Sequence, residues 1–308
     1  MKIINGISKI KKFPRPVVAL GIFDGVHLAH RKIIQDAVKQ AAAIKGTSLV
    51  VTFWPHPRGA HSLYSLNHRL NLIAELGIQV AVVIKFDRKF SQLSAQDFIE
   101  NILVKKIGAK YIFVGDNFHF GRYATGDIKL LKKFSQIYSF RLKTYKIIYY
   151  RHQPISSTFI RGLIKKGNLA GAKKLLFRRV SVLGTVIHGT SLARKFGFPT
   201  ANLNPHHEVL PPPGVYLVSV FFQDKKFNAV CYIGPKPTFI APRAKMKLEK
   251  DTHIEVHIFN FSGDLYGKDL ELQFLRKLRG AKKFGNTAAL ITQVNKDIKT
   301  AKQRFSHP

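Results

Sequence analysis

Apolar and polar positions follow different patterns in the two halves of the chain. In the first half, short runs rich in Val, Ile and Phe alternate with segments whose apolar residues recur at helical spacing. The predicted strands are Val17–Leu20, Leu49–Phe53, Val80–Phe86 and Tyr111–Gly115, and the predicted helices are Arg31–Ile44, His68–Leu76, Ala95–Ile107 and Asp127–Ile137. Buried strands that alternate with helices are typical of a parallel sheet covered on both faces. The first half is therefore expected to be an α/β domain.

After residue 180, strand-like segments follow one another with turn residues between them. The predicted strands are Ser181–Ile187, Gly214–Phe222, Ala229–Gly234, Thr252–Phe261 and Asp269–Leu275, and a helix is predicted over Thr287–Lys302. This pattern indicates a β barrel or sandwich with a C-terminal helix. Between the halves, Ser157–Leu176 has helical spacing and three glycines and is expected to connect two domains. The predicted boundaries are residues 1–160, 161–180 and 181–308.

Length and cysteine content limit the class of protein. The chain has 308 residues, 45% of them hydrophobic, which is enough for two cores, and its single cysteine, Cys231, cannot form an internal disulfide. The early apolar run Val17–Phe23 is far shorter than the roughly 18 residues that span a bilayer. We expect a cytoplasmic protein without a membrane partner. Whether it forms a homo-oligomer is left open by the sequence.

The charge is strongly positive, with 51 Lys and Arg against 17 Asp and Glu and a net charge of +34. Such an excess is typical of proteins that bind nucleic acid or anionic membranes. Here the basic residues are scattered through both halves, and no block of five or six occurs. A scattered excess favours a solvated surface, so no nucleic-acid partner is expected. A basic nucleic-acid-binding protein on a nucleotide-binding fold remains an alternative.

The first candidate site follows the first predicted strand, at residues 21–30 (GIFDGVHLAH). In an open parallel sheet, phosphates bind beyond the strand ends and beside a helix N-terminus. His27 and His30 are three residues apart at that helix start, so both rings can point at one anion. Their ring N–H groups could stabilise a triphosphate and a leaving pyrophosphate, which indicates nucleotidyl transfer. On these residues alone, two histidines that cap a helix or are exposed by chance are the favoured interpretation.

The wider sequence resembles a known family. Residues 21–30 resemble the H-x-G-H signature of nucleotidyltransferases and match G-x-F-D-G-V-H-L-x-H of bacterial bifunctional riboflavin kinase/FAD synthetases. Further matches follow in the family's order at residues 52–57 (TFWPHP), 114–121 (VGDNFHFG) and 155–161 (ISSTFIR). The resemblance implies a Rossmann-like nucleotidyltransferase domain that transfers AMP from ATP to FMN, giving FAD and pyrophosphate.

The resemblance also assigns residues to this first site. His27 and His30 would polarise the ATP phosphates, and Asn117 would contact nucleotide or flavin. The other residues implied in ATP and phosphate binding are Gly21, Phe23, Asp24, Gly25, Ser156, Ser157, Thr158 and Arg161. Ser-Ser-Thr is also an ordinary helix cap, and a cap and an anion site use the same unpaired N–H groups.

One residue of the signature departs from the family, because Ala29 stands where the family has glycine. A methyl group at this position would crowd a close approach of the nucleotide to the backbone. A riboflavin kinase with an impaired synthetase half is therefore an alternative function.

The second candidate site combines two glycines, Gly184 and Gly189, with the segment Pro199-Thr200-Ala201-Asn202. A tight glycine loop suits phosphates, and the Thr200 hydroxyl and Asn202 amide oxygens suit Mg²⁺. Without context these residues form a turn followed by a strand. Pro-Thr-Ala-Asn, however, resembles the riboflavin kinase signature, which implies ATP binding by these residues, including Pro199, and Mg²⁺ binding by Thr200 and Asn202.

Glu255 is the candidate catalytic residue of the second half. In 252–261, Ile254, Val256 and Ile258 alternate with His253, Glu255 and His257, so the polar residues share one face. The pattern alone allows a solvated face, a His-x-Glu-x-His metal site or a single catalytic carboxylate. The resemblance selects the carboxylate, which would take the proton from the riboflavin 5′-hydroxyl.

Other parts of the second half match the family in order, and some depart from it. The matches are residues 213–216 (PGVY), 233–234 (IG), 237–238 (PT), 264–267 (DLYG) and Arg279 with Phe284; the departures are Tyr232 for Asn, Lys236 for Arg, Ala193 for Gly, and Gly280-Ala281 after Arg279. A lysine in place of arginine keeps the charge but loses the planar fork. The whole pattern predicts an enzyme that makes FMN from riboflavin and then FAD from FMN, using ATP and Mg²⁺.

Overall fold

The computed structural model of the chain describes residues 1–57, 62–189, 197–235 and 252–306. The chain forms two compact units, Met1–Ile160 and Arg161–Pro308. Positions named in the sequence analysis that lie outside the described residues are Ala193, Lys236, Pro237 and Thr238. Within the described ranges, no helix is long and apolar enough to cross a membrane.

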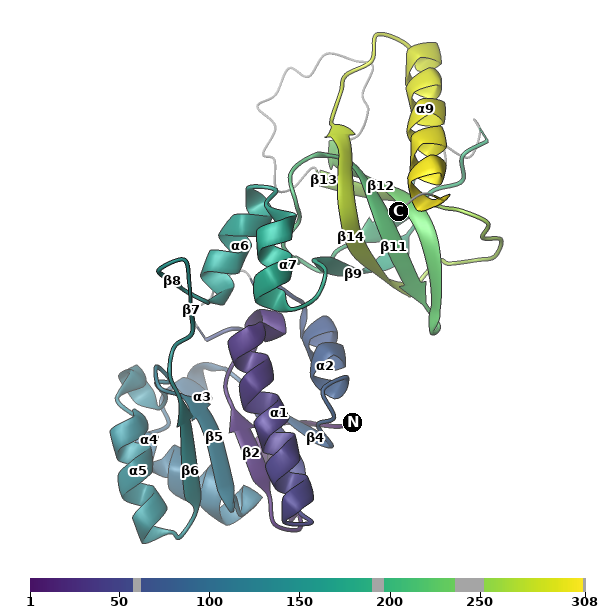
Figure 1. Cartoon of the computed structure of the whole chain (residues 1–308). Helices are drawn as coiled ribbons and strands as arrows, with labels where there is room; N and C mark the ends of the chain where they lie inside the picture. The colour runs from purple at the N-terminus through teal and green to yellow at the C-terminus, as the bar shows by residue number, and fades with distance from the viewer. Residues whose placement is uncertain (58–61, 190–196, 236–251, 307–308) are drawn as a thin grey trace. The chain divides into compact units, whose positions relative to one another are not determined.

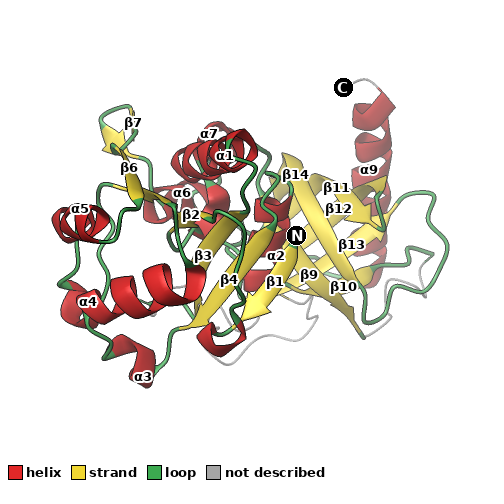
Figure 2. Cartoon of the chain, turned by 90° about the horizontal axis from the view of Figure 1, so that it is seen from below, coloured by secondary structure: helices red, strands yellow, loops and turns green. Residues whose placement is uncertain are grey.

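The first unit contains a six-stranded parallel sheet in the order β1-β4-β3-β2-β5-β6 (Figures 1 and 2). Its strands are β1 (Lys2–Asn5), β2 (Val17–Leu20), β3 (Ser48–Trp54), β4 (Val80–Lys85), β5 (Tyr111–Gly115) and β6 (Arg141–Tyr145). The four inner strands are those predicted from sequence. The two edge strands were not predicted, because β6 has no fully buried residue and β1 has one, so neither forms an apolar run.

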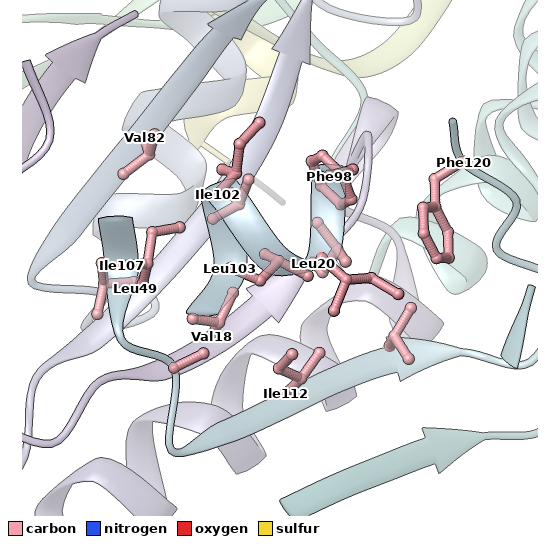
Figure 3. Packing of buried hydrophobic residues seen from close by; sticks show 14 of the residues in the cluster. Val18, Leu20, Leu49, Val82, Phe98, Ile102, Leu103, Ile107, Ile112 and Phe120 are labelled. Atoms are coloured by element: carbon pink, nitrogen blue, oxygen red, sulfur yellow. The ribbon is translucent and has the colours of Figure 1, made fainter. Parts of the chain in front are cut away.

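Helices cover both faces of this sheet. They are α1 (Leu28–Ala43), α2 (Leu66–Ala74), α3 (Arg88–Ser91), α4 (Ala95–Asp97), a π-type helix over Phe98–Ile107 and α5 (Ile128–Ile137), with short 3₁₀ turns at Ile7–Lys9, Asp24–Val26 and Arg122–Ala124. On one face, Val18, Leu49 and Val82 pack with Phe98 and Ile102, as Figure 3 shows. On the other face, α1 lies against β2, β3 and β5. The parallel α/β prediction is confirmed.

Two helices follow a small hairpin of β7 (Tyr149–Tyr150) and β8 (Gln153–Pro154). They are α6 (Ser157–Lys165) and α7 (Leu169–Leu176), within the segment predicted to be helical. The break between them falls at Gly167, whose φ of 77° is a left-handed value that favours glycine. The Asn168 side chain then caps α7 by accepting a hydrogen bond of 2.8 Å from the Gly171 N–H.

The second unit is a closed barrel in the order β10-β13-β12-β11-β14-β9. Its strands are β9 (Ser181–Ile187), β10 (Ala201–Asn204), β11 (Gly214–Phe222), β12 (Lys225–Pro235), β13 (Thr252–Ile258) and β14 (Asp269–Gly280). The barrel decides between the two architectures that the sequence allowed. Strand β10 was not among the predicted strands, although a strand after the turn at Pro199 was considered, and β13 ends at Ile258 rather than at Phe261.

The last helix, α9 (Thr287–Ser306), lies along the barrel wall (Figure 1). Its Ala301 packs with Val215, Leu217, Val230 and Phe259 in one buried cluster. The helix therefore covers part of the outer surface of the barrel. A helix was predicted here over Thr287–Lys302, and it continues to Ser306.

Candidate active sites

The first candidate site lies where the order of the parallel sheet reverses. From β2 the chain continues to β3 on one side and later returns to β5 on the other side. The crevice beyond the carboxyl ends of two such strands is where open α/β sheets bind ligands. Residues 21–30 leave β2 at this place, and Asn117 follows the end of β5.

The backbone between β2 and α1 turns sharply. Phe23, Gly25 and Val26 have φ values of 55°, 81° and 40°, all in the left-handed region. A Cβ on Gly25 would lie 2.5 Å from Leu63 Cδ1, so glycine is required both by the backbone and by the space. Left-handed valine and phenylalanine are uncommon, and such strain is typical of functional turns.

The two signature histidines are stacked on each other. Their ring centroids are 3.6 Å apart with 20° between the planes, and Phe23 meets His30 edge-on at 5.3 Å. Helix α1 begins at Leu28, earlier than predicted, so His27 is its N-cap residue and His30 is in its first turn. The sequence expectation that both rings share one helix start therefore agrees with the geometry.

Burial keeps His30 uncharged. It is the largest of the effects that hold its pKa well below the ordinary value of 6.5, and the neighbouring His27 and Arg69 lower the pKa further. The Nδ1 atom of His30 is buried and has no hydrogen-bond partner among the described residues. A buried ring nitrogen without a partner is costly, so this atom is available to a ligand at the site.

Asp24 is engaged with the backbone of the next segment. Its carboxylate accepts hydrogen bonds from the Leu63 N–H at 2.8 and 3.0 Å and from the Tyr64 N–H at 3.4 Å, and the residue is 2% exposed. The side chain thus ties the signature segment to the turn before α2. Sequence reasoning assigned Asp24 to ATP binding, and this structural task was not predicted.

Arg69 is a further residue at this site that sequence reasoning missed, and Thr52, part of the matched segment 52–57, has a contact that was not predicted. Both donate to the Ile22 carbonyl, Thr52 Oγ1 at 2.8 Å and Arg69 Nη1 at 2.7 Å. Arg69 comes from α2, 47 positions from Ile22 in the sequence. The only sign of Arg69 in the sequence was an arginine among the apolar positions of a predicted helix.

Asn117 and the start of α6 complete the first unit's candidate residues. Asn117 is exposed, and its Oδ1 lies against Gly115, 3.3 Å from where a Cβ would be. Ser156 caps α6 by accepting from the Phe159 N–H at 3.2 Å, and Ser157 Oγ donates to the Asp24 carbonyl at 2.8 Å. The structure thus brings Ser157 to the signature segment. Thr158 and Arg161 lie on the same helix, and Arg161 belongs to the second unit.

The second candidate site is built around Asn202 in β10. Asn202 is paired with Ile187 of β9 and with Glu255 of β13. A Cβ on Gly189 would lie 2.1 Å from Asn202 Nδ2, so the glycine leaves room for the amide. Gly184 is equally restricted, since a Cβ would lie 2.8 Å from the Asn204 carbonyl oxygen. Gly184 is therefore a steric requirement of the strand pairing, and Gly189 is required by the position of the Asn202 side chain.

Glu255 lies in a row of three cross-strand neighbours. The register places Asn202 of β10 on one side of it and Tyr232 of β12 on the other. Side chains directly opposite in antiparallel strands are about 5 Å apart at Cβ. Ile254 and Val256 are buried in the barrel wall's other face, so Glu255 is turned outward with His253 and His257, as the alternation predicted.

Two histidines of the second half each join segments that were matched to the family. His257 Nδ1 lies 2.9 Å from the Pro199 carbonyl oxygen, which joins β13 to the Pro-Thr-Ala-Asn segment. His188 stacks on Tyr266 at 3.9 Å and joins the Gly184–Gly189 segment to the DLYG match. Across the described ranges, no group of three or more His, Cys, Asp and Glu side chains could hold a metal ion. The His-x-Glu-x-His metal interpretation is thus not supported.

An ion pair fixes Arg279 at the end of β14. Its Nε donates to both oxygens of Asp297 at 3.0 Å, and Nη2 donates to Asp297 Oδ2 at 2.7 Å. Burial, followed by the Glu255 carboxylate, raises the pKa of Tyr232, and Arg279 opposes the rise. Tyr232 therefore lies within electrostatic range of both charged groups. Asp297 of α9 was not predicted, because its partner is remote in sequence.

Comparisons with known proteins agree with this division. A family model described as FAD synthetase matches residues 9–159, and one described as riboflavin kinase matches residues 176–305. A bifunctional riboflavin kinase/FMN adenylyltransferase of Buchnera aphidicola subsp. Schizaphis graminum is 35% identical and covers 99% of each chain. The protein of that name from Escherichia coli strain K12 is 33% identical, covering 99% of this chain and 98% of its own.

The fold is also found among solved structures. A crystal structure described as a macrolide-efflux protein from Streptococcus pneumoniae matches with a TM-score of 0.80 at 27% identity. The match covers 98% of this chain and 99% of that one. The α/β unit and the barrel, each with its own candidate phosphate site, define a two-site transferase. Its family follows from the comparisons: the chain belongs to the bifunctional riboflavin kinase/FMN adenylyltransferases.

Proposed function

We propose that this chain makes FAD from riboflavin in two ATP-dependent steps. The barrel phosphorylates riboflavin to FMN, and the α/β unit transfers AMP from a second ATP to FMN. The observation that carries the proposal is that both family models match this one chain, each over a unit that holds a candidate cluster, the stacked His27–His30 pair and the Asn202–Glu255 pair.

In the kinase step, the 5′-hydroxyl oxygen of riboflavin forms a bond to the γ-phosphorus of ATP. The bond from that phosphorus to the β-bridging oxygen breaks, and ADP leaves. Glu255 accepts the hydroxyl proton, since it is an outward-facing carboxylate beside Asn202. Gly184, Gly189 and Pro199 shape the segments that would hold the ATP phosphates.

The oxygen groups beside Glu255 fit Mg²⁺. Thr200 offers a hydroxyl and Asn202 an amide oxygen, and the absent side chain of Gly189 leaves room for that amide. Hard oxygen ligands with room for phosphate oxygens and water are what Mg²⁺ requires. When bound, the ion would neutralise charge on the transferring phosphate, while Thr200 and Asn202 hold it in place.

In the adenylyl step, a phosphate oxygen of FMN forms a bond to the α-phosphorus of ATP, and pyrophosphate leaves. His27 and His30 would stabilise the charge that grows on the leaving group, because both rings lie at the start of α1. Ser156, Ser157, Thr158 and Arg161 would bind a second phosphate at the start of α6. Gly21, Phe23, Asp24 and Gly25 shape the loop, and Asn117 would contact nucleotide or flavin.

The proposed domains are residues 1–160 for adenylyl transfer, 161–180 for the connector and 181–308 for the kinase. The family matches at 9–159 and 176–305 support this division, as does the change of compact unit after Ile160. We also propose that the chain functions in the cytoplasm. We further propose that it has no nucleic-acid partner, because its basic residues are scattered.

A product time course tests the proposed function. Purified chain is incubated with riboflavin, ATP and Mg²⁺, and flavins are separated by chromatography. FMN should rise first and FAD should follow, with one pyrophosphate released per FAD. FMN that accumulates without FAD would support the impaired-synthetase alternative, for which Ala29 is the candidate cause, and an Ala29→Gly variant should then restore FAD formation. No turnover of either flavin would overturn the proposal.

A further inference from the structure

Arg69 is a fully buried arginine behind the signature segment. Its exposed fraction is 0%, and Trp54 lies under the guanidinium with its ring centroid 5.5 Å away. Nη1 donates to the Ile22 carbonyl at 2.7 Å, and Nη2 donates to the Phe53 carbonyl at 3.2 Å. One side chain of α2 thus joins the backbone just beyond β2 to the carboxyl end of β3.

A buried guanidinium is expensive to keep for structural reasons alone. Removing a cation from water costs several kcal/mol, and a well-packed apolar residue often replaces such a group without loss of stability. Burial lowers the pKa of Arg69 to about 10, and the Asp24 carboxylate opposes this shift, so the group remains charged at neutral pH. Its Nε atom is buried and has no hydrogen-bond partner among the described residues. These observations indicate that the positive charge of Arg69 has a functional role in addition to a structural one.

We propose that Arg69 is a positioning residue of the adenylyl-transfer site, one that holds the Ile22–Phe23 turn in place and puts a fixed positive charge next to the His27–His30 pair. The proposal rests on the proposed adenylyl-transfer function. Its geometric basis is the pair of carbonyls that Arg69 bridges, since Ile22 directly precedes the left-handed Phe23, whose ring contacts His30.

The charge of Arg69 adds to the effect of burial on the protonation of His30. Among the described residues, the charged groups that lower the pKa of His30 are the stacked His27 and Arg69 from α2, and Asp24 acts on Arg69 from the signature segment. Both His27 and Arg69 disfavour a proton on His30. The ring therefore enters the reaction neutral, with one N–H to donate and one nitrogen that can take a proton as negative phosphate groups arrive.

Two substitutions separate the charge from the shape. Arg69→Met removes the charge and keeps a long, unbranched side chain. Arg69→Lys keeps the charge but loses the planar guanidinium that bridges two carbonyls. Arg88→Met is the control, because it removes an exposed arginine of the same unit. All are made in the full-length chain, so riboflavin phosphorylation on the same chain reports the amount of active barrel.

The first readout needs no activity. The pKa of His30 is measured by NMR of the histidine rings, with the signal assigned from a His30→Gln variant. The wild type should titrate well below 6.5, and Arg69→Met should raise the pKa above the wild-type value. Arg69→Lys and Arg88→Met should leave it near the wild-type value.

The second readout is FMN adenylation across pH. With Arg69→Met, the pKa in the pH dependence of kcat/KM for ATP should rise together with the NMR value, and kcat/KM should fall about 10-fold or more. Arg69→Lys should lower kcat/KM without moving that pKa. Riboflavin phosphorylation should be unchanged in all variants.

The outcomes are distinguishable. A His30 pKa that is the same in Arg69→Met and the wild type contradicts the proposal, as does an equal shift in Arg88→Met. If Arg69→Met does not fold, the proposal is tested by the His30 pKa of the wild type and of Arg69→Lys. A wild-type His30 that titrates at or above 6.5 then overturns the proposal. A wild type that shows the low His30 pKa but forms no FAD instead contradicts the proposed adenylyl-transfer function.

Discussion

Acidic side chains in this basic protein show how surroundings decide the role of one residue type. Asp24 accepts backbone hydrogen bonds from Leu63 and Tyr64, Glu208 accepts one from Leu183, and Asp297 pairs with Arg279. All three acids are buried. Glu255 is partly exposed, turned outward, and placed beside the amide of Asn202. Its surroundings thus differ from those of the three buried acids in the way that the proposed general-base role requires.

Replacement of Glu255 by glutamine should abolish FMN formation while leaving adenylation of supplied FMN intact. The amide has the same shape but cannot accept the hydroxyl proton, so kinase turnover should fall at least about 100-fold. Steady-state assays of each step, run on the same preparation, provide the measurement. Wild-type kinase rates in Glu255→Gln would exclude the general-base role.

Replacement of His30 by alanine should have the opposite effect. It removes one of the two stacked rings at the start of α1, so FAD formation from FMN should fall about 100-fold or more while riboflavin phosphorylation persists. Pyrophosphate release from FMN and ATP measures the loss. A variant that loses both activities would indicate that the two sites are not separate.

Residues near each other in sequence were predicted better than residues that meet through the fold. His27 and His30 could be paired from their spacing, because one helical turn brings them together. The Asp297–Arg279 pair and the Arg69 hydrogen bond to Ile22 span 18 and 47 positions, and no local pattern indicates either contact.

At the scale of elements, apolar runs predicted the strands that are buried and missed those at edges or with mixed faces. Strands β2 to β5 of the first unit have several buried residues each, whereas β6 has none. Strand β10 is short, with one buried residue, Leu203. Its position becomes clear only from its pairing with β9 and β13, which is a property of the closed barrel.

The contact between Gly189 and β10 can be tested by adding one methyl group. Gly189→Ala would bring a Cβ within 2.1 Å of Asn202 Nδ2, so the amide must move away from its place opposite Glu255. A displacement of about 1 Å at a reacting group can cost about 100-fold in rate, and a comparable loss of riboflavin phosphorylation is expected.

Gly162→Ala is the matched control for this change. A Cβ at Gly162 meets nothing within 4 Å, and the residue is inside α6, where alanine is the better helix former. Its kinase rate should equal that of the wild type, and adenylation of FMN by Gly189→Ala should also be unchanged. Equal kinase rates for Gly189→Ala and the wild type would contradict the role given to this contact.

At the scale of the whole molecule, the net charge of +34 and the small number of acids have different explanations. Several acids are retained where the fold needs them, at helix caps such as Asp87 and Asp127 and in the buried contacts of Asp24 and Asp297. The basic excess is scattered over both units. It should attract phosphate-bearing substrates in general without defining a site.

The central claim is that two independent sites on one chain act in sequence, and mixing two single-site variants tests it most directly. Given riboflavin, ATP and Mg²⁺, Glu255→Gln alone should form neither flavin product, and His30→Ala alone should stop at FMN. Mixed in equal amounts, they should form FAD, because FMN released by one variant is the substrate of the other. A mixture that forms no FAD, although each variant keeps its remaining activity on supplied substrate, would contradict the account.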